Sequence, residues 1–480
     1  MSILKKCIGL LLFLIFTAGT AESQIIPIKS LPLAGGDQFA YLPAENGGLA
    51  GLSMAVADGY LDPFLNPAKG AKVAASWVYT APAFYRIQNN LGRARTLPMG
   101  LYFAGTPLFG GFAVSMQNFD PQSSPAAGNR LSDRSANNLM ATGALGFKVN
   151  DRLSLGVGAS YADLQALDGV QMLYAWNDRV EQEGSIKSGR LSALYQMDGK
   201  RELEATLVHQ RTDMTHRITP LWGWAWMNTL PGDDERPPTR TELDRHRLWG
   251  GHLGFRTPMG TRGWTLALAT TYNRKTHPKI PNYDIMRIPR DPGYSDAFRL
   301  GLGLSKTRGP VTFGVEMISE PITSKTWAEA AGDTNTVSGN PILTGGRTIE
   351  NRFKFKNFWY RMGLKRDNEK WGFQLGMQWR NISYRLHQLD YLAENDRRQK
   401  ENWLEWTFTW GLTLRFPEFN LLYHGKLLTG GGLPGVGGDW MFFAETDAAM
   451  NADFIVAPAG ALSLQDANVI THRITCVIPL

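Results

Sequence analysis

The sequence predicts an all-β protein, a transmembrane antiparallel β-barrel of 14–16 strands with an N-terminal plug (hatch) segment. Three observations predict this fold. The N-terminus has the composition of an export signal, long segments alternate apolar with polar residues, and short turns alternate with long polar connections.

The first 21 residues are typical of a cleaved signal peptide. Lys5 and Lys6 precede the apolar run 8–16, and small residues that suit signal peptidase end at Ala21. A membrane-spanning helix needs about 20 apolar residues, so this run is too short to be one. No later segment is long and apolar enough either. We therefore expect residues 1–21 to be removed on export, and any membrane crossing to use strands.

The strand signal is period-two alternation. Residues 404–416 alternate Leu, Trp, Phe, Trp, Leu, Leu and Phe with Glu, Thr, Thr, Gly, Thr and Arg, and 371–379 carries Trp at both ends of its apolar face. Successive side chains on a strand point to opposite faces, so one face is apolar and the other polar. Eight steps tilted by about 40° cover roughly 20 Å, close to the apolar band of an outer-membrane barrel. Similar strands are expected near 71–80, 97–104, 109–117, 152–161, 191–197, 264–272, 298–304, 311–317 and 419–427.

A soluble β-sandwich also alternates, but its strands average five or six residues, and many of these segments reach about ten. The connections favour the barrel too, because outer-membrane barrels have short periplasmic turns and long extracellular loops. Short turns are expected at 150–151, 198–200, 257–262, 307–309, 366–368 and 417–418. Long loops are expected near 118–138, 163–185, 213–243, 274–294, 321–349, 388–401 and 428–469.

Composition is consistent with a barrel. The chain has 51 Gly and 15 Trp, which suit a crowded inner wall and aromatic girdles at the membrane surfaces. Its net charge of +7 is spread along the chain without a nucleic-acid recognition motif, and it suits anionic lipid head groups or lipopolysaccharide. Beyond the signal only Cys476 remains, so no internal disulfide or cysteine metal cluster is expected.

Residues 22–70 lack alternation and contain five prolines. Such a segment could fill the lumen as a plug or form a disordered periplasmic tail, and its many Ile, Leu and Phe residues favour the plug. The expected organisation is a signal peptide at 1–21, a plug or hatch at 22–70, and the barrel with long extracellular loops at 71–480.

Several stretches resemble the FadL/TodX family of outer-membrane transporters for hydrophobic compounds. They are Ala57-Asp58 through Asn66-Pro67-Ala68, Met99 to Leu108, Phe112 to Ser115, and the hairpin from Gly146 to Tyr161. The likeness covers roughly residues 35–165 and is architectural afterwards, and Lys69 stands where the family usually has Gly. The resemblance implies a 14-stranded barrel, a hatch containing Asn66, Pro67 and Ala68, and passive uptake of fatty-acid-like or aromatic molecules through a lateral opening.

Three sets of residues are candidate sites whose roles stay open. The tryptophans Trp222, Trp224 and Trp226 could be a first landing site for an apolar ligand, or they could extend a strand and belong to the outer girdle. Basic residues of the 274–294 loop could pair with lipopolysaccharide phosphates or simply be solvated. Polar-face charges could line a channel, or they could pair with the plug or form hydrated wall: Arg256, Glu316, Arg380, Glu405 and Arg415.

A catalytic role is not expected. The eight histidines are scattered, and the sequence has no HExxH motif, no metal-ligand spacing and no phosphate-binding loop. No catalytic residue, metal or cofactor is therefore assigned. The expected function is passive transport of a hydrophobic small-molecule ligand by a monomer in the bacterial outer membrane, in contact with membrane lipid and lipopolysaccharide and not with nucleic acid. The alternatives are a general porin and a barrel adaptor of a protein secretion system.

Overall fold

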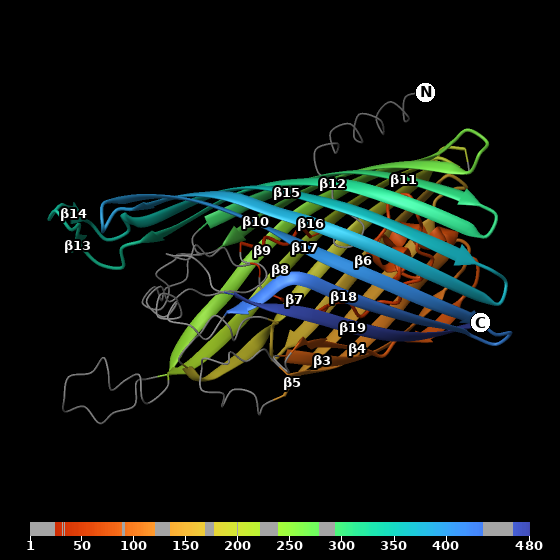
Figure 1. Cartoon of the computed structure of the whole chain (residues 1–480), viewed down its shortest axis with the longest axis horizontal. Helices are drawn as coiled ribbons and strands as arrows, with labels where there is room; N and C mark the ends of the chain where they lie inside the picture. The colour runs from red at the N-terminus through yellow and green to blue at the C-terminus, as the bar shows by residue number, and fades with distance from the viewer. Residues whose placement is uncertain are drawn as a thin grey trace.

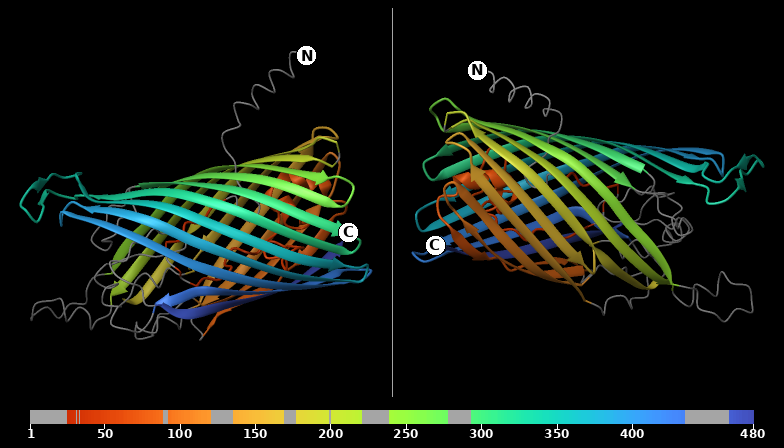
Figure 2. Two further views of the ribbon diagram at one scale, coloured as in Figure 1. Left: turned by 45° about the horizontal axis from the view of Figure 1, so that its top comes forward. Right: turned by 180° about the vertical axis from the view of Figure 1, so that it is seen from behind.

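Long antiparallel strands close into a barrel, and the described residues between 25 and 76 that precede them lie inside it (Figures 1 and 2). The computed structural model describes residues 25–30, 32, 34–88, 92–120, 135–168, 177–198, 200–220, 239–277, 293–434 and 464–480. The expected signal peptide and Trp222, Trp224 and Trp226 lie outside these ranges.

The elements follow one another along the chain with little besides strands. They are α2 (Asp62–Leu65), η1 (Pro67–Lys72), β1 (Trp77–Thr80), β2 (Ala83–Ile87), β3 (Gly92–Phe103), β4 (Leu108–Asp120), β5 (Ala136–Lys148), β6 (Leu153–Leu164), β7 (Asn177–Gln196), β8 (Glu202–Pro220), β9 (Arg240–Met259), β10 (Trp264–His277), β11 (Gly293–Arg308), β12 (Val311–Glu329), β13 (Thr334–Asn335), β14 (Pro341–Ile342), β15 (Arg347–Asp367), β16 (Trp371–Asp390), β17 (Asn395–Arg415), β18 (Asn420–Pro434) and β19 (Leu464–Pro479). No helix in the described ranges is long and apolar enough to cross a membrane.

The barrel has 16 strand positions. β1 and β2 count as one position, because both pair with β3 on one side and with β19 on the other. Pro82 lies between them and cannot donate a ladder hydrogen bond, which accounts for the break. The predicted range of 14–16 strands is confirmed at its upper limit. The 14 strands implied by the family resemblance are wrong for this chain.

The outer face of the barrel carries a band of exposed apolar side chains, called here the apolar band. Leu300, Leu302 and Leu375 are exposed there, whereas the adjacent Gln374 points inward and is buried. At the upper edge of the band, Trp379 packs against Phe358 and Tyr360 with ring centroids 5.6 and 5.7 Å away. Such an aromatic edge is typical of a membrane–water interface. The alternation read from the sequence therefore has the expected sense in this band, with apolar residues outside.

The strands extend further than the alternation indicated. β16 and β17 pair without interruption up to Asp390 and Asn395, so the long loop expected at 388–401 is wrong and only residues 391–394 form a turn. Much of the loop expected at 321–349 is likewise strand, including the small β13–β14 hairpin. Above the apolar band both faces of β17 carry polar residues, so period two disappears although the backbone ladder continues. β15, β16 and β17 have 21, 20 and 21 residues, against 12 or 13 in β3–β6.

The end of the barrel away from the β13–β14 hairpin carries the short turns, as expected. The C-terminus lies at this end, on the right in Figure 1; we call it the lower end and the other the upper end. β19 ends at Pro479, as its missing donor predicts, and the Leu480 N–H donates to the Ser76 carbonyl (2.8 Å). The strand expected at 71–80 begins only at Trp77, because residues 71–72 belong to η1.

Candidate functional site

Residues 25–76, called here the N-terminal segment, contact the wall around the lumen. The segment bonds to β5 through Tyr41, to β18 through Asp37 and to β15 through Glu45. Its last part, α2 and η1, lies inside the barrel at the lower end (Figure 1). The segment that the sequence set apart therefore lies across the lumen.

Asn66, Pro67 and Ala68 are buried against the wall of β6 and β8. The Asn66 side chain accepts the Ala68 N–H (3.2 Å) and donates to Glu204 Oε2 (2.7 Å). Ser154 Oγ donates to the Ala68 carbonyl (2.9 Å). A Cβ at Gly156 would lie 2.5 Å from the Ala68 nitrogen, so only glycine lets the segment approach this closely. The three residues thus fix the segment to the wall.

Lys69 adds an ion pair at the same place. Its ammonium lies 3.3 Å from Asp62 Oδ2 and 3.0 Å from Glu204 Oε2, and the residue is 8% exposed. Burial would lower the pKa of Lys69, but the two carboxylates raise it overall. Lys69, at the position where the FadL/TodX family usually has Gly, therefore holds the segment to the wall through a buried ion pair.

Asp58 organises the preceding turn. Its carboxylate accepts backbone N–H groups from Glu45 (2.9 Å), Asn46 (2.8 Å), Tyr60 (3.1 Å) and Leu61 (2.9 Å). Burial, together with the nearby charge of Glu45, raises its pKa to about 6. The carboxylate joins two stretches of the segment that are otherwise irregular.

Backbone hydrogen bonds and an ion pair join the segment to the wall at mid-height. Glu316 accepts the Ser53 N–H (2.8 Å) and the Met54 N–H (2.7 Å), and Lys29 pairs with Glu405. A cavity of about 30 Å³ lies beside Met54 and Glu316, which is room for about one water. The lumen is therefore tightly packed here.

The five polar-face charges of the sequence analysis have partners. Glu316 and Glu405 pair with the N-terminal segment. Arg256 pairs with Glu202 (2.5 Å), Arg380 with Glu320 (3.4 Å) and Arg415 with Asp367 (2.6 Å). Two of the five therefore hold the segment, and the other three pair within the wall.

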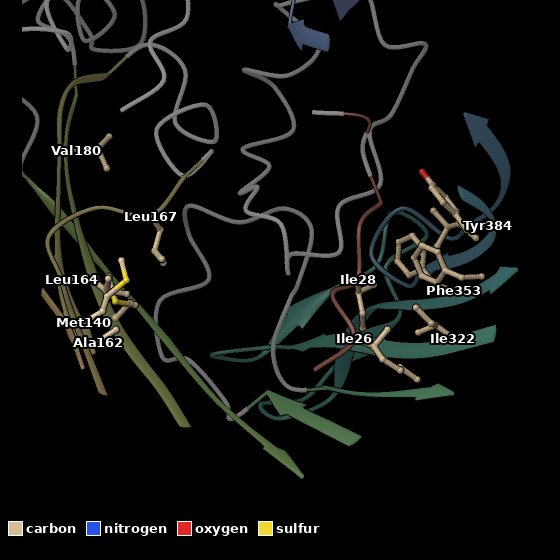
Figure 3. Close-up of a cluster of buried hydrophobic side chains, with 14 of the residues drawn as sticks. Ile26, Ile28, Met140, Ala162, Leu164, Leu167, Val180, Ile322, Phe353 and Tyr384 are labelled. Atoms are coloured by element: carbon tan, nitrogen blue, oxygen red, sulfur yellow. The ribbon is translucent and has the colours of Figure 1, made fainter. Parts of the chain in front are cut away.

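Above this layer apolar inward side chains occur among polar ones such as Ser324, His216 and Asn351. The apolar ones form the upper apolar patch, made of Ile26, Ile28, Tyr41, Met140, Ala162, Leu164, Leu167, Val180, Met214, Ile218, Ala297, Ile322, Phe353, Phe355, Tyr384 and Leu386. Figure 3 shows Ile26 and Ile28 of the segment beside Ile322, Phe353 and Tyr384, with Met140, Ala162 and Leu164 on another part of the wall. Apolar groups thus gather on the loop side of the segment.

The upper apolar patch was missed in the sequence. Residues 352–357, Arg-Phe-Lys-Phe-Lys-Asn, alternate clearly, but their apolar positions were not assigned to the lumen. The missing signal is parity: counting in twos from inward Arg361 up β15 gives Phe355 and Phe353 the same inward side. The pattern therefore inverts along the strand, from apolar outside to apolar inside.

A second cavity, of about 520 Å³, lies at the lower end between the segment and β17–β19. Tyr60 and Trp77 line it beside Arg415 and Asn420. Among the described residues, no group of three or more His, Cys, Asp or Glu side chains could hold a metal ion. The lumen thus has an apolar upper part, a closed middle and a mixed lower cavity.

No protein-family model matches the sequence, and no curated protein matches it. Solved structures with a similar barrel include a Pseudomonas aeruginosa FadL homologue, at 14% identity, TM-score 0.39 and coverage of 91% of this chain and 98% of that chain. The Pseudomonas putida toluene transporter TodX has 10% identity, TM-score 0.37 and coverage of 90% and 96%. The P. aeruginosa ferric enterobactin receptor PfeA has 9% identity, TM-score 0.35 and coverage of 84% and 80%. What passes through this barrel has to be inferred from its own residues.

Proposed function

We propose that the chain is a passive transporter of the bacterial outer membrane for hydrophobic small molecules, with the N-terminal segment as its hatch. The observation that carries the proposal is the upper apolar patch, which includes Ile26 and Ile28 of the segment itself. An apolar surface binds fatty-acid-like or aromatic molecules and gains little from hydrated solutes. Because the segment is part of this surface, ligand binding and segment position are linked.

The outer face of the barrel supports placement in a membrane. Exposed leucines and phenylalanines such as Leu302 and Phe408 face outward in the band, and leaving this area in water would be unfavourable. The ladder closes on itself through β19 and β1, so no edge strand is exposed to lipid. Short turns at one end suit the periplasm.

Transport requires the segment to move. Its bonds to Glu316 and Glu405 close the middle of the lumen, and a ligand on the upper apolar patch would weaken the contacts of Ile26 and Ile28 by competing for the same surface. The ligand then leaves below the lipopolysaccharide layer through the wall or the lower cavity. Experiment decides between exit through the wall and exit through the lower cavity.

Conductance across a planar bilayer tests the hatch. We expect small, intermittent currents from the full chain, because the segment bonds to the wall at mid-height. Large steady currents would refute the hatch and favour a general porin. Co-purification of a secreted client protein would instead favour an adaptor.

Uptake tests the ligand class. Cells that express the chain should accumulate labelled oleate or toluene faster than cells without it, and glucose uptake should not change. Ile322→Asn introduces a polar group into the upper apolar patch and should lower hydrophobic uptake several-fold. Ile318→Asn is the matched control, because Ile318 is also buried on β12 but is not part of the patch. Equal loss in both variants would contradict the assignment.

A further inference from the structure

Lys354, Arg385 and Lys400 lie side by side on the outer face of the barrel. Lys354 is directly opposite Arg385 across β15 and β16, and Arg385 is directly opposite Lys400 across β16 and β17. Lys356 lies one outward position below Lys354. All four side chains are exposed. We call these four residues the basic face.

No described acidic side chain neutralises the basic face. Among the described residues, none of the four has an ion-pair partner, whereas nearby Arg352 bonds to Glu350 (2.6 Å). Like charges directly opposite each other on neighbouring strands are destabilising. A row of three therefore lowers the stability of the free barrel slightly, and an anion that binds it removes that cost.

The position of the basic face restricts its occupant. Lys356 is two residues from Phe358, and Phe358, Tyr360 and Trp379 form the aromatic edge of the apolar band on the same strands. Trp406 continues this edge on β17, opposite Trp379. The four cations therefore lie just outside the band, on the side of the long connections. An anion bound there would lie at the membrane surface with apolar contacts below it.

We infer that the basic face binds the phosphates of lipopolysaccharide, with the acyl chains of its lipid A against the aromatic edge. Arg385 can donate two parallel hydrogen bonds to one phosphate, and the flanking lysines supply point charges on either side. Strands spaced about 4.8 Å apart place the outer two cations about 10 Å from each other, so the row can meet more than one phosphate. Binding at this site requires only that the upper end of the barrel faces the cell exterior, and it does not depend on what the barrel transports.

The site differs from the one considered in the sequence. The bases of the 274–294 loop lie mostly outside the described residues, and Arg274 is paired with Asp296 (3.6 Å). The basic face instead lies on paired strands, which hold its cations in a fixed row.

Equilibrium binding of labelled deep-rough lipopolysaccharide to the detergent-purified full chain tests the inference. Each base near an anionic membrane surface contributes to the attraction, so K354Q/R385Q/K400Q should bind at least about tenfold more weakly. The control R152Q/K200Q/R308Q removes three exposed bases from the lower end and should stay within about twofold of wild type. Dephosphorylated lipid A should bind the wild type as weakly as intact lipid A binds the triple variant.

Several results would overturn the inference. They are a triple variant that binds as the wild type does, a control that loses as much affinity, or phosphatidylglycerol that binds as tightly as the glycolipid. Heat-modifiable migration checks that each variant is folded. If the triple variant fails to fold, R385Q alone should still weaken binding, and R385K should retain most of it.

Discussion

Replacing Lys69 with Met tests whether a buried ion pair holds the N-terminal segment in the lumen. Met has a similar length and keeps the apolar contacts of the lysine stem, so the change removes mainly the charge. Asp62 and Glu204 then remain buried without the ammonium that lies 3.3 and 3.0 Å from them. Because the pair joins the segment to β8, its loss should release the segment and leave the barrel folded.

The magnitude follows from the partners that remain. Removing one member of a buried ion pair costs roughly 3–5 kcal/mol. Glu204 keeps hydrogen bonds from Asn66 (2.7 Å) and His252 (3.3 Å), so we expect the lower part of that range or less, about 2–3 kcal/mol. Each 1.4 kcal/mol is a factor of ten, so the released population should rise about 30- to 150-fold.

Limited proteolysis in detergent and single-channel recording measure this population. When opening is fast relative to cleavage, the cleavage rate follows the released fraction. K69M should be cleaved within residues 25–76 much faster than wild type, with more frequent current bursts and unchanged heat-modifiable migration. K69M/E204Q should recover part of the loss, because the second change removes one uncompensated charge.

The matched control is Lys72→Gln. Lys72 also pairs with an acid on β8, Glu202, but its side chain is 33% exposed, so its loss should cost less than about 1 kcal/mol. Unchanged cleavage and conductance in K69M would refute the anchoring role. An equal effect in both variants would show that position, and not burial of the charge, decides release.

Two further predictions concern the wall and a loop. Glu320→Ala leaves Arg299 and Arg380 without the buried carboxylate that lies 2.8 and 3.4 Å from them, so the barrel should lose about 3–5 kcal/mol and unfold at a lower temperature, followed by heat-modifiable migration. Burial raises the pKa of Asp168 from 3.8 to about 6, although the hydrogen bond from the Gly36 N–H lowers it, so packing of the 34–42 region over this carboxyl group should strengthen as pH falls from about 7 to 5. Hydrogen exchange of the 34–42 region, corrected for intrinsic rates, checks this, and Asp168→Asn should abolish the pH dependence. A dependence of opposite sign would contradict the assignment.

The sequence predicted the membrane band well, because there the environment acts on each side chain separately. Leu300 and Leu302 lie on the apolar outer face, and close contact with the segment requires glycine at position 156. Each residue type therefore indicates its own surroundings. Above the band, Arg397 and Arg398 on opposite faces of β17 both meet polar surroundings, and no signal distinguishes strand from loop.

The segment and its anchors were only partly predictable. Five prolines set the segment apart and Asn66 was named in advance, but the pairing of Lys69 with Glu204 joins residues far apart in sequence. Such contacts depend on where the chain returns in space, which local patterns do not encode. The inward direction of Phe353 can be predicted by counting in twos from Arg361, because side chains alternate between the two faces of a strand.

The unequal strand lengths give the barrel an oblique mouth. β16 has 20 residues and β3 has 12, so the wall near β16 rises about 20 Å higher, at about 3.3 Å per residue and 40° tilt. In the proposed orientation, the tall side, which carries the basic face, would extend beyond the lipid into the lipopolysaccharide sugars, and the β3–β6 side would end near the lipid surface. A greasy molecule that has penetrated the sugars would therefore reach the lumen most easily over the low rim, without crossing the full height of the wall.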